Sequence, residues 1–342
     1  MIRPSAAVLV LASLLAAACA DAPTAIDRAA PVRGPAKVTA SAAGGWVYGS
    51  YTNAYGSRAY QLWVPAGYTG ATAVPLMVMM HGCQQTPADF AAGTRMNQIA
   101  DARGFLVLYP QQSVFANASS CWNWFYIANQ VRGSGEPSII AGMIDAVKAG
   151  YDVDAARVGA AGISAGAAMS TVLACTYPDK VRKVASSAGL MYGAATTSIG
   201  GVNAMTYGSI YDPTAEGTDC YNRMGSNRRT IPVLVFQGTA DPYVNPLNAT
   251  QTVGQWTQTA DLTTDGADNG NVDATADATV SGTACRAYTQ SDYRSSTTGA
   301  TVVRKYLVSG LGHAWSGGST AGPYSDPCGP DASTLIANFF GF

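Results

Sequence analysis

The chain has 342 residues, of which 20 are basic and 21 acidic, so its formal net charge is −1. Because no basic surplus is present to neutralise phosphates, we expect no nucleic acid partner. Charged residues make up only 12% of the chain and hydrophobic residues 48%, which excludes a wholly disordered protein and is typical of a secreted one.

The first residues have the pattern of an export signal. A short basic start precedes a run of thirteen residues over 6–18 that is apolar except for Ser13, and this run is too short to span a bilayer. We expect a signal peptide over residues 1–19, ending either at an ordinary cleavage site or at Cys19 as a lipid attachment site. Residues 20–45 are rich in Pro, Ala, Thr and Ser, which indicates a flexible tether. No other apolar run in the sequence is long enough to cross a membrane.

Residues 46–342 are predicted to form one α/β catalytic domain. Apolar or alternating runs that end at Gly or Pro predict strands over 59–64, 74–80, 105–109, 156–161, 231–236 and 302–308. Helical spacing predicts helices over 88–102, 138–149, 165–176 and 335–340. This alternation of strands and helices predicts a mostly parallel sheet with helices on both faces.

Residues 261–279 interrupt the alternation. They contain five aspartates and almost no large apolar side chain. A calcium-binding loop is one interpretation, but the spacing of the acidic residues does not match that of an EF-hand. We therefore expect a solvated surface insertion at this point of the chain.

Six cysteines follow the signal region, at Cys83, Cys121, Cys175, Cys220, Cys285 and Cys328. An even number in an exported chain predicts disulfides, and six cysteines allow 15 different pairings. The sequence has no C-x-x-C motif and only two histidines, so we expect no zinc site and no other metal.

Residues 162–166 read Gly-Ile-Ser-Ala-Gly and match the pattern G-x-S-x-G. They lie between a predicted strand and a predicted helix, which is the context in which this pattern presents a nucleophilic serine on a sharp turn. The amino end of the helix favours negative charge that develops next to it. We therefore predict Ser164 as a nucleophile.

A serine nucleophile needs a base, and only His81 and His313 are available. His313 follows the last predicted strand, which fits the order Ser, Asp, His along the chain. His81 precedes the serine and is expected to shape a loop. Among the acidic residues between Ser164 and His313, Asp241 alone directly follows a buried strand, so we predict that it orients the imidazole.

The oxyanion of a tetrahedral intermediate requires two backbone N–H donors. We expect one at Ala165, directly after the nucleophile, and the other at Cys83, in the loop that follows the strand over 74–80. The alternative is that this loop is only a turn that ends the strand.

Three tryptophans in the sequence are candidates for a place in the predicted site. Trp122 and Trp124 belong to a dense aromatic block, and Trp315 follows His313 by two residues. Together with His81 they are our candidates for substrate-binding residues that line an ester pocket. The alternative is that the tryptophans pack in the core or in a lid.

The chain resembles the polyhydroxybutyrate depolymerase family of esterases, which is close to the feruloyl and acetylxylan esterases. The matching stretches are PLMVMMHGCQQTPADFAAGTRMNQIADARGFLVLYPQQ, CWNWF, GEPSIIAGMIDAV, VGAAGISAGAAMS, FQGTADPYVNP and GLGHAWSGGS with GPDAS. The resemblance implies an α/β-hydrolase fold, no cofactor, and ester hydrolysis through an acyl-enzyme by Ser164, Asp241 and His313.

The resemblance also leads to an expected substrate. We expect hydrolysis of short-acyl esters, including amorphous poly(3-hydroxybutyrate) or its oligomers. Feruloyl esterase, acetylxylan esterase and serine peptidase activities remain alternatives, as does an inactive binding lipoprotein. Only 29 residues follow His313, so we expect poor action on crystalline polymer. We further expect a Cys83–Cys121 disulfide, because both cysteines follow predicted strands near the site.

Overall fold

The structure is a computed structural model, and it describes residues 44–342. The expected signal peptide over 1–19, the candidate lipid attachment site Cys19 and the tether up to residue 43 lie outside the described residues. The first strand, β1, begins at Gly45, where the expected tether ends.

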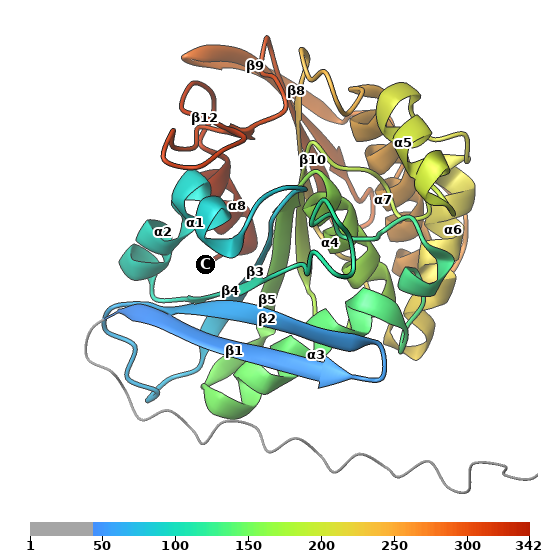
Figure 1. The fold of residues 1–342 in the computed structure, drawn as a ribbon. Coiled ribbons are helices and arrows are strands. Elements are labelled where there is room, and N and C mark those ends of the chain that lie inside the picture. The colour runs from blue at the N-terminus through green and yellow to red at the C-terminus, as the bar shows by residue number, and fades with distance from the viewer. Residues whose placement is uncertain (1–43) are drawn as a thin grey trace, which may run out of the picture. The chain divides into compact units, whose positions relative to one another are not determined.

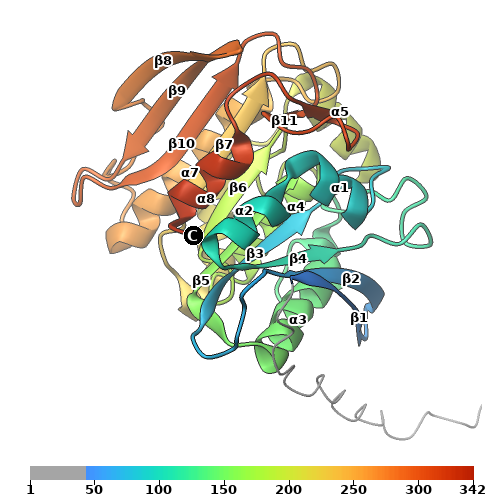
Figure 2. The ribbon, with the colours of Figure 1, turned by 90° about the vertical axis from the view of Figure 1, so that its left-hand side faces the viewer.

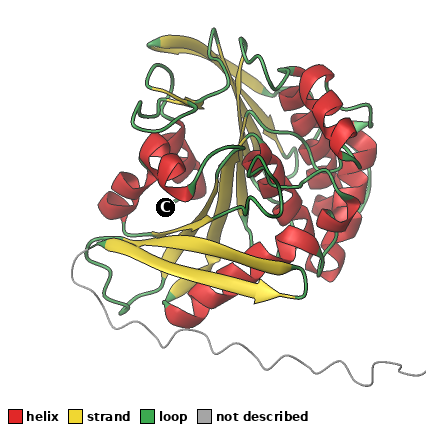
Figure 3. Cartoon of the chain, viewed as in Figure 1, coloured by secondary structure: helices red, strands yellow, loops and turns green. Residues whose placement is uncertain are grey.

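A ten-stranded sheet forms the centre of the described part (Figures 1 and 3). Its strand order is β1–β2–β4–β3–β5–β6–β7–β10–β9–β8. The strands are β1 (Gly45–Asn53), β2 (Gly56–Val64), β3 (Val74–Met80), β4 (Leu106–Pro110), β5 (Val153–Ile163), β6 (Lys183–Ser187), β7 (Val233–Gly238), β8 (Ala278–Ala284), β9 (Arg286–Arg294) and β10 (Thr301–Val308). From β4 to β10 all neighbours are parallel, whereas β1–β2 and β9–β8 extend the two edges as antiparallel pairs. The prediction of a mostly parallel sheet is confirmed.

Helices cover both faces of this sheet. In Figure 2, α1, α2 and α8 lie in front of the sheet and α3, α4 and α7 behind it. The helices are α1 (Pro87–Thr94), α2 (Met96–Arg103), α3 (Gly135–Gly150), α4 (Ala165–Thr176), α5 (Ser198–Tyr207), α6 (Pro213–Met224), α7 (Leu247–Asp265) and α8 (Ala332–Phe340). Short 3-10 turns at Ile127–Asn129 and Gly225–Asn227, and a small pair of strands, β11 (Trp315–Ser316) and β12 (Ser325–Asp326), complete the described elements.

The apolar run of β3 explains why this strand lies at the centre. Leu76, Val78 and Met80 pack into the core cluster that contains the side chains of α3 and α4, whereas Met77 and Met79 pack into the cluster formed with α1, α2 and α8. A strand that is covered by helices on both faces needs apolar side chains at every position, because successive side chains point to opposite faces.

The helix predicted over 88–102 is two helices in the structure. Arg95 separates them with a left-handed backbone (φ 55°), and its N–H donates to the carbonyl of Ala91 to close α1. The Arg95 guanidinium donates to the Gly317 carbonyl at 2.6 Å. A tertiary contact with a distant loop therefore stabilises a break that local spacing does not indicate.

Residues 261–279 are only partly the solvated insertion that we expected. Helix α7 extends to Asp265, and the buried Asp261 accepts hydrogen bonds from the N–H groups of Asn269, Gly270 and Val272 at 2.9 to 3.1 Å. This aspartate thus organises the loop that follows the helix. Among residues 44–342 no cluster of three or more His, Cys, Asp or Glu residues has a geometry that could hold a metal ion.

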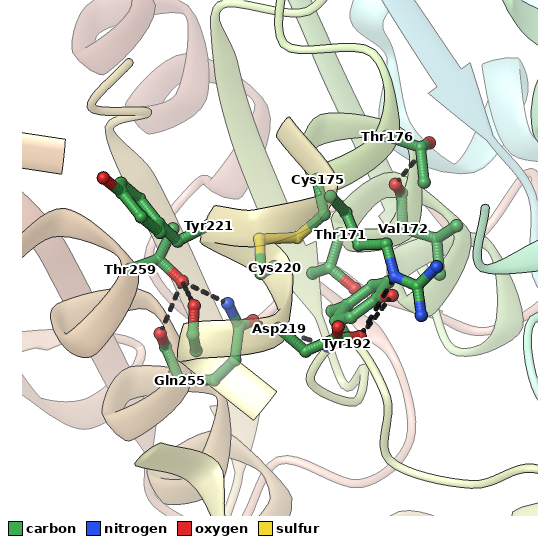
Figure 4. Close-up of a disulfide and its surroundings, with 12 residues drawn as sticks. Thr171, Val172, Cys175, Thr176, Tyr192, Asp219, Cys220, Tyr221, Gln255 and Thr259 are labelled. Carbon is green, nitrogen blue, oxygen red and sulfur yellow. Dashed lines mark hydrogen bonds and ion pairs between the residues drawn. A yellow bond between two sulfur atoms is a disulfide. The ribbon is translucent and has the colours of Figure 1, made fainter. Parts of the chain in front are cut away.

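All six cysteines of the described part form disulfides, and the predicted Cys83–Cys121 pair is confirmed. The other pairs are Cys175–Cys220 and Cys285–Cys328. Figure 4 shows how Cys175 of α4 and Cys220 of α6 join these two helices. Beside them, Thr259 of α7 donates to the Gly217 carbonyl of α6 at 3.0 Å, so three helices are tied together on this face.

Candidate active site

Ser164 occupies a sharp turn between β5 and α4. Its backbone has a positive φ, with φ 56° and ψ −124°, which is unfavourable for a residue with a side chain. The turn is held because the Ser164 N–H donates to the Ser187 carbonyl of β6 at 2.9 Å. The Ser164 side chain does not cap α4, so its hydroxyl is not used to satisfy the helix end.

The glycines on both sides of Ser164 allow a close approach of backbones. A Cβ atom at Gly162 would collide with the backbone of Gly166, and one at Gly166 would collide with the Met80 carbonyl oxygen. The start of α4 thus packs directly against the ends of β5 and β3. This packing is the physical reason for the two glycines in the G-x-S-x-G pattern.

His313 and Asp241 form a hydrogen-bonded pair next to this turn. The Nδ1 atom of His313 lies 2.8 Å from Oδ2 of Asp241, whose side chain is fully buried. The other oxygen of Asp241 accepts the N–H groups of Tyr243 and Val244, each at 2.9 Å. The loops after β10 and β7 therefore bring together the two residues predicted as base and acid.

The environment keeps Asp241 ionised. Burial raises the pKa of Asp241, but the hydrogen bond to His313, the charge of its imidazolium form and the two backbone N–H donors together hold this pKa below its ordinary value. An ionised carboxylate only accepts hydrogen bonds, so Nδ1 of His313 carries a proton. In a neutral imidazole the Nε2 atom is then free to accept a proton.

Ser164 and His313 line one cavity of about 210 Å³. Its other lining residues carry no formal charge and are Gly82, Cys83, Gln84, Gln85, Ile163, Met205, Tyr243 and Tyr324. The rings of Tyr243 and Tyr324 contact the His313 ring edge-to-face, with centroids 5.4 and 5.9 Å away. The predicted nucleophile and base thus face the same space, between two aromatic side chains.

His81 is buried outside this cavity and shapes the loop over 82–85. Its Nδ1 atom lies 2.7 Å from the Gly82 carbonyl oxygen, and its Nε2 atom accepts the Gln112 N–H at 3.1 Å. In a trans peptide the C=O of one residue and the N–H of the next point in opposite directions. The His81 ring therefore lies on the side of the Gly82–Cys83 peptide opposite to the Cys83 N–H, and Cys83 is one of the residues that line the cavity.

The protonation of His81 agrees with this structural role. Burial lowers the pKa of His81 to about 4, although its bond to Gly82 and the charge of Asp89 act in the opposite direction. The ring is neutral at neutral pH, with both nitrogens engaged in hydrogen bonds to the backbone. These contacts leave it no role as a base and do not place it against a substrate in the cavity.

A buried polar network contacts His81 through Gln112, and the sequence did not predict this network. The Gln112 side chain donates to Glu136 at 2.5 Å and accepts from Arg58 at 2.6 Å, while Arg58 and Glu136 form a buried ion pair at 3.2 Å. Asn123 adds two N–H donors to the same carboxylate. These residues come from β2, α3 and the loop after β4, so no local pattern in the sequence connects them.

The three tryptophans are core residues, and none of them lines the cavity. Trp122 donates to the His81 carbonyl at 3.1 Å. Trp124 is buried in the core cluster of α3 and α4. The Trp315 ring packs edge-to-face on Phe90, and its N–H donates to Ser333 at 3.0 Å. The alternative interpretation, packing in the core, is therefore the one that the structure supports.

Comparison with known proteins identifies the family. Residues 58–283 match the family model described as Esterase PHB depolymerase. The chain belongs to this esterase family. It is 33% identical to poly(3-hydroxyalkanoate) depolymerase C of Paucimonas lemoignei over 81% of this chain and 65% of that protein. It is 30% identical to feruloyl esterase B of Neurospora crassa over 71% of this chain and 79% of that protein.

A solved structure supports the fold of this esterase. The acetyl xylan esterase from Aspergillus awamori superimposes with a TM-score of 0.67 and 18% identity, and the match covers 86% of this chain and 99% of that chain. The α/β-hydrolase fold and the family expected from the sequence are both confirmed. The match to depolymerase C spans less than two thirds of that protein's own length.

Proposed function

We propose that this esterase is a serine hydrolase with Ser164 as nucleophile, His313 as general base and Asp241 as the residue that orients the base. The observation that carries the proposal is the His313–Asp241 pair at 2.8 Å on the cavity that Ser164 also lines. The strained backbone of Ser164 supports it, because such strain persists where a reactive group must be held in place.

The proposed reaction runs in two halves. The Ser164 hydroxyl attacks the ester carbonyl carbon while Nε2 of His313 takes its proton. The N–H groups of Ala165 and Cys83 donate to the oxyanion, and the ionised Asp241 stabilises the imidazolium. Collapse of the intermediate expels the alcohol, which receives the proton from His313. A water molecule then repeats the sequence on the acyl-enzyme and releases the acid.

We propose short-acyl esters as substrates, and polyhydroxyalkanoates such as poly(3-hydroxybutyrate) as the main class. The relationship to depolymerase C supports this class. The lining of the cavity agrees, because its side chains other than His313 are uncharged and provide no clamp for an acidic substrate. Feruloyl esters are a second candidate, since Tyr243 and Tyr324 offer aromatic faces beside His313.

We further propose that the protein is exported. Three disulfides in residues 44–342 support an oxidising compartment. In the same range no helix is long and apolar enough to cross a membrane. Attachment of a lipid at Cys19 stays a prediction, and the intact mass of the mature protein tests it.

A substrate panel tests the proposed activity. Under one condition, product release is measured from p-nitrophenyl butyrate, amorphous poly(3-hydroxybutyrate), methyl ferulate, acetylated xylan and a peptide p-nitroanilide. We expect release from the butyrate ester and from the amorphous polymer, and none from the peptide. Strong release from ferulate or acetylated xylan, with none from the polymer, would assign the enzyme to the sugar-ester branch.

A further inference from the structure

The segment that contributes Met205 to the cavity carries exposed apolar side chains and no charged residue. The stretch from Leu190 to Tyr211 contains no Asp, Glu, Lys or Arg, although it includes the surface helix α5. Exposed faces of helices are ordinarily charged or polar. Here Ile199 is 75% exposed, Val202 62% and Ile210 90%. Ile199 and Val202 are three residues apart on α5, so they are neighbours on one face of the helix.

Helix α5 also reaches the cavity. Met205 of α5 lines the cavity together with Ser164, and the Asn245 N–H donates to the Met205 carbonyl at 2.8 Å. The loop from Asp241 to α7 therefore runs beside α5, beyond the carboxyl ends of the parallel strands (Figure 2). This loop exposes Tyr243, which also lines the cavity.

Two more exposed side chains complete the surface. Tyr207 at the end of α5 is 74% exposed and Leu247 is 47% exposed. Leu247 packs against Gly208, where an added Cβ atom would lie 2.7 Å from the leucine side chain. We call this surface the apolar rim, and it consists of Ile199, Val202, Tyr207, Ile210, Tyr243 and Leu247.

We propose that the apolar rim is a docking surface for a solid, uncharged polyester, which places the ester next to the cavity. The inference rests on the proposed function and deepens it. Any body that covers the rim also covers the cavity mouth, because Tyr243 belongs to both. A second copy of the chain on this surface would block access to Ser164. A solid substrate that binds to the rim instead presents its own ester groups to the cavity.

The apolar side chains of the rim favour a polyester over a polysaccharide ester. Ile199, Val202 and Ile210 have no hydrogen-bonding groups in their side chains, so they gain nothing from the hydroxyl groups of a xylan chain. The methyl and methylene groups of a polyester can instead bury apolar area against them. The absence of charge on α5 also removes any electrostatic attraction to anionic lipid surfaces.

The test uses the full chain and a triple variant, Ile199→Thr with Val202→Thr and Ile210→Thr. None of these residues lines the cavity. Binding to amorphous poly(3-hydroxybutyrate) film is measured in a Ser164→Ala background, and hydrolysis is measured with Ser164 intact. We expect adsorption to the polymer and product release from it to fall roughly tenfold or more, because the variant loses apolar area that the polymer would bury. The kcat/KM for p-nitrophenyl butyrate should stay within about twofold.

A control variant removes exposed apolar area elsewhere. Tyr48→Thr and Val280→Thr change exposed positions on the two edge strands, β1 and β8. This variant should adsorb like the wild type. The proposal is overturned if the triple variant adsorbs unchanged, if both variants lose adsorption equally, or if the soluble and solid rates fall in parallel.

Further outcomes separate the proposal from its alternatives. A wild-type dimer in solution that the triple variant dissociates would assign the rim to a second copy of the chain. Hydrolysis of p-nitrophenyl butyrate without adsorption to any polyester would overturn the docking surface and leave the esterase mechanism intact. If folded Ser164→Ala still hydrolyses the ester, the proposed mechanism is overturned. The adsorption measurements would still show whether the apolar rim binds the polymer.

Discussion

The two sides of the cavity are held in different ways. Residues 82–85 are fixed by a disulfide, by the His81 ring and by Gln85, which accepts the Gly82 N–H and donates to the Pro323 carbonyl. In another part of the cavity lining, α5 contributes Met205 to the cavity and exposes Ile199 and Val202 to solvent. The side proposed to stabilise an oxyanion is built from buried polar contacts, because donors must be preorganised to act. The side proposed to meet the substrate is apolar and open.

Replacing each of the two histidines tests this difference most directly. His313→Ala should lower kcat by about 10⁴-fold or more, because it removes the base. His81→Ala should lower kcat by only about 10- to 100-fold, since it disturbs one oxyanion donor and removes no reacting group. Both rates are measured on p-nitrophenyl butyrate with proteins shown to be folded by circular dichroism. The reverse order of the two losses would refute the assignment of roles.

Removing either of two disulfides should lower stability, but removing only one of them should also lower the rate of catalysis. Cys83–Cys121 and Cys175–Cys220 close segments of 38 and 45 residues, so replacing either pair by serines should lower the free energy of unfolding by a similar amount, about 4 kcal/mol. Only the first replacement frees the loop beside Ser164, and it should also lower kcat about tenfold. Equal effects on kcat in the two variants would mean that the loop does not depend on its disulfide.

The buried His81 should make stability depend on pH. The folded pKa of about 4 lies below the ordinary value of 6.5, so the contribution is fully present above about pH 6.5 and is lost as the pH falls toward 4. The loss should reach about 3 kcal/mol by pH 4. Urea unfolding at pH 7 and pH 4.5 measures it, and His81→Gln should remove most of the difference. An unchanged pH dependence in His81→Gln would contradict this interpretation.

A change in the polar network that contacts His81 should lower the rate about as little as the loss of the Cys83–Cys121 disulfide. Glu136→Gln should lower kcat about tenfold with little change in KM, because it loosens Gln112 and hence the ring that orients the Cys83 N–H. Asp179→Asn is the matched control. It also removes one negative charge, but from the more exposed ion pair with Arg132. A loss of stability in Glu136→Gln without a loss in kcat would limit the network to folding.

The features that the sequence predicted most accurately are those that depend on a local pattern of residues. The strand over 74–80 and the helix over 165–176 agree with β3 and α4 to the residue, because unbroken apolar runs and a sharp glycine-flanked turn leave few alternatives. Elimination between two histidines predicted His313 as the base, and the structure places His313 next to Asp241, the predicted acid.

The remaining features depend on tertiary contacts. Helix α5 is Gly-rich and uncharged and has no clear amphipathic period, so neither the helix nor Met205 was predicted. The tryptophans next to the motifs pack inward, whereas Tyr243 and Tyr324 line the cavity. Nearness in sequence to a catalytic residue therefore did not indicate which aromatic side chains face the cavity.

Covalent labelling of Ser164 tests the central claim most directly. An organophosphate ester such as diethyl p-nitrophenyl phosphate transfers its phosphoryl group to an activated serine, and peptide mass spectrometry locates the modified residue. We predict complete inactivation with one label per chain, on Ser164, and no label in Ser164→Ala or His313→Ala at the same reagent concentration. A label on another residue, or full ester hydrolysis by folded Ser164→Ala, would contradict the proposed site.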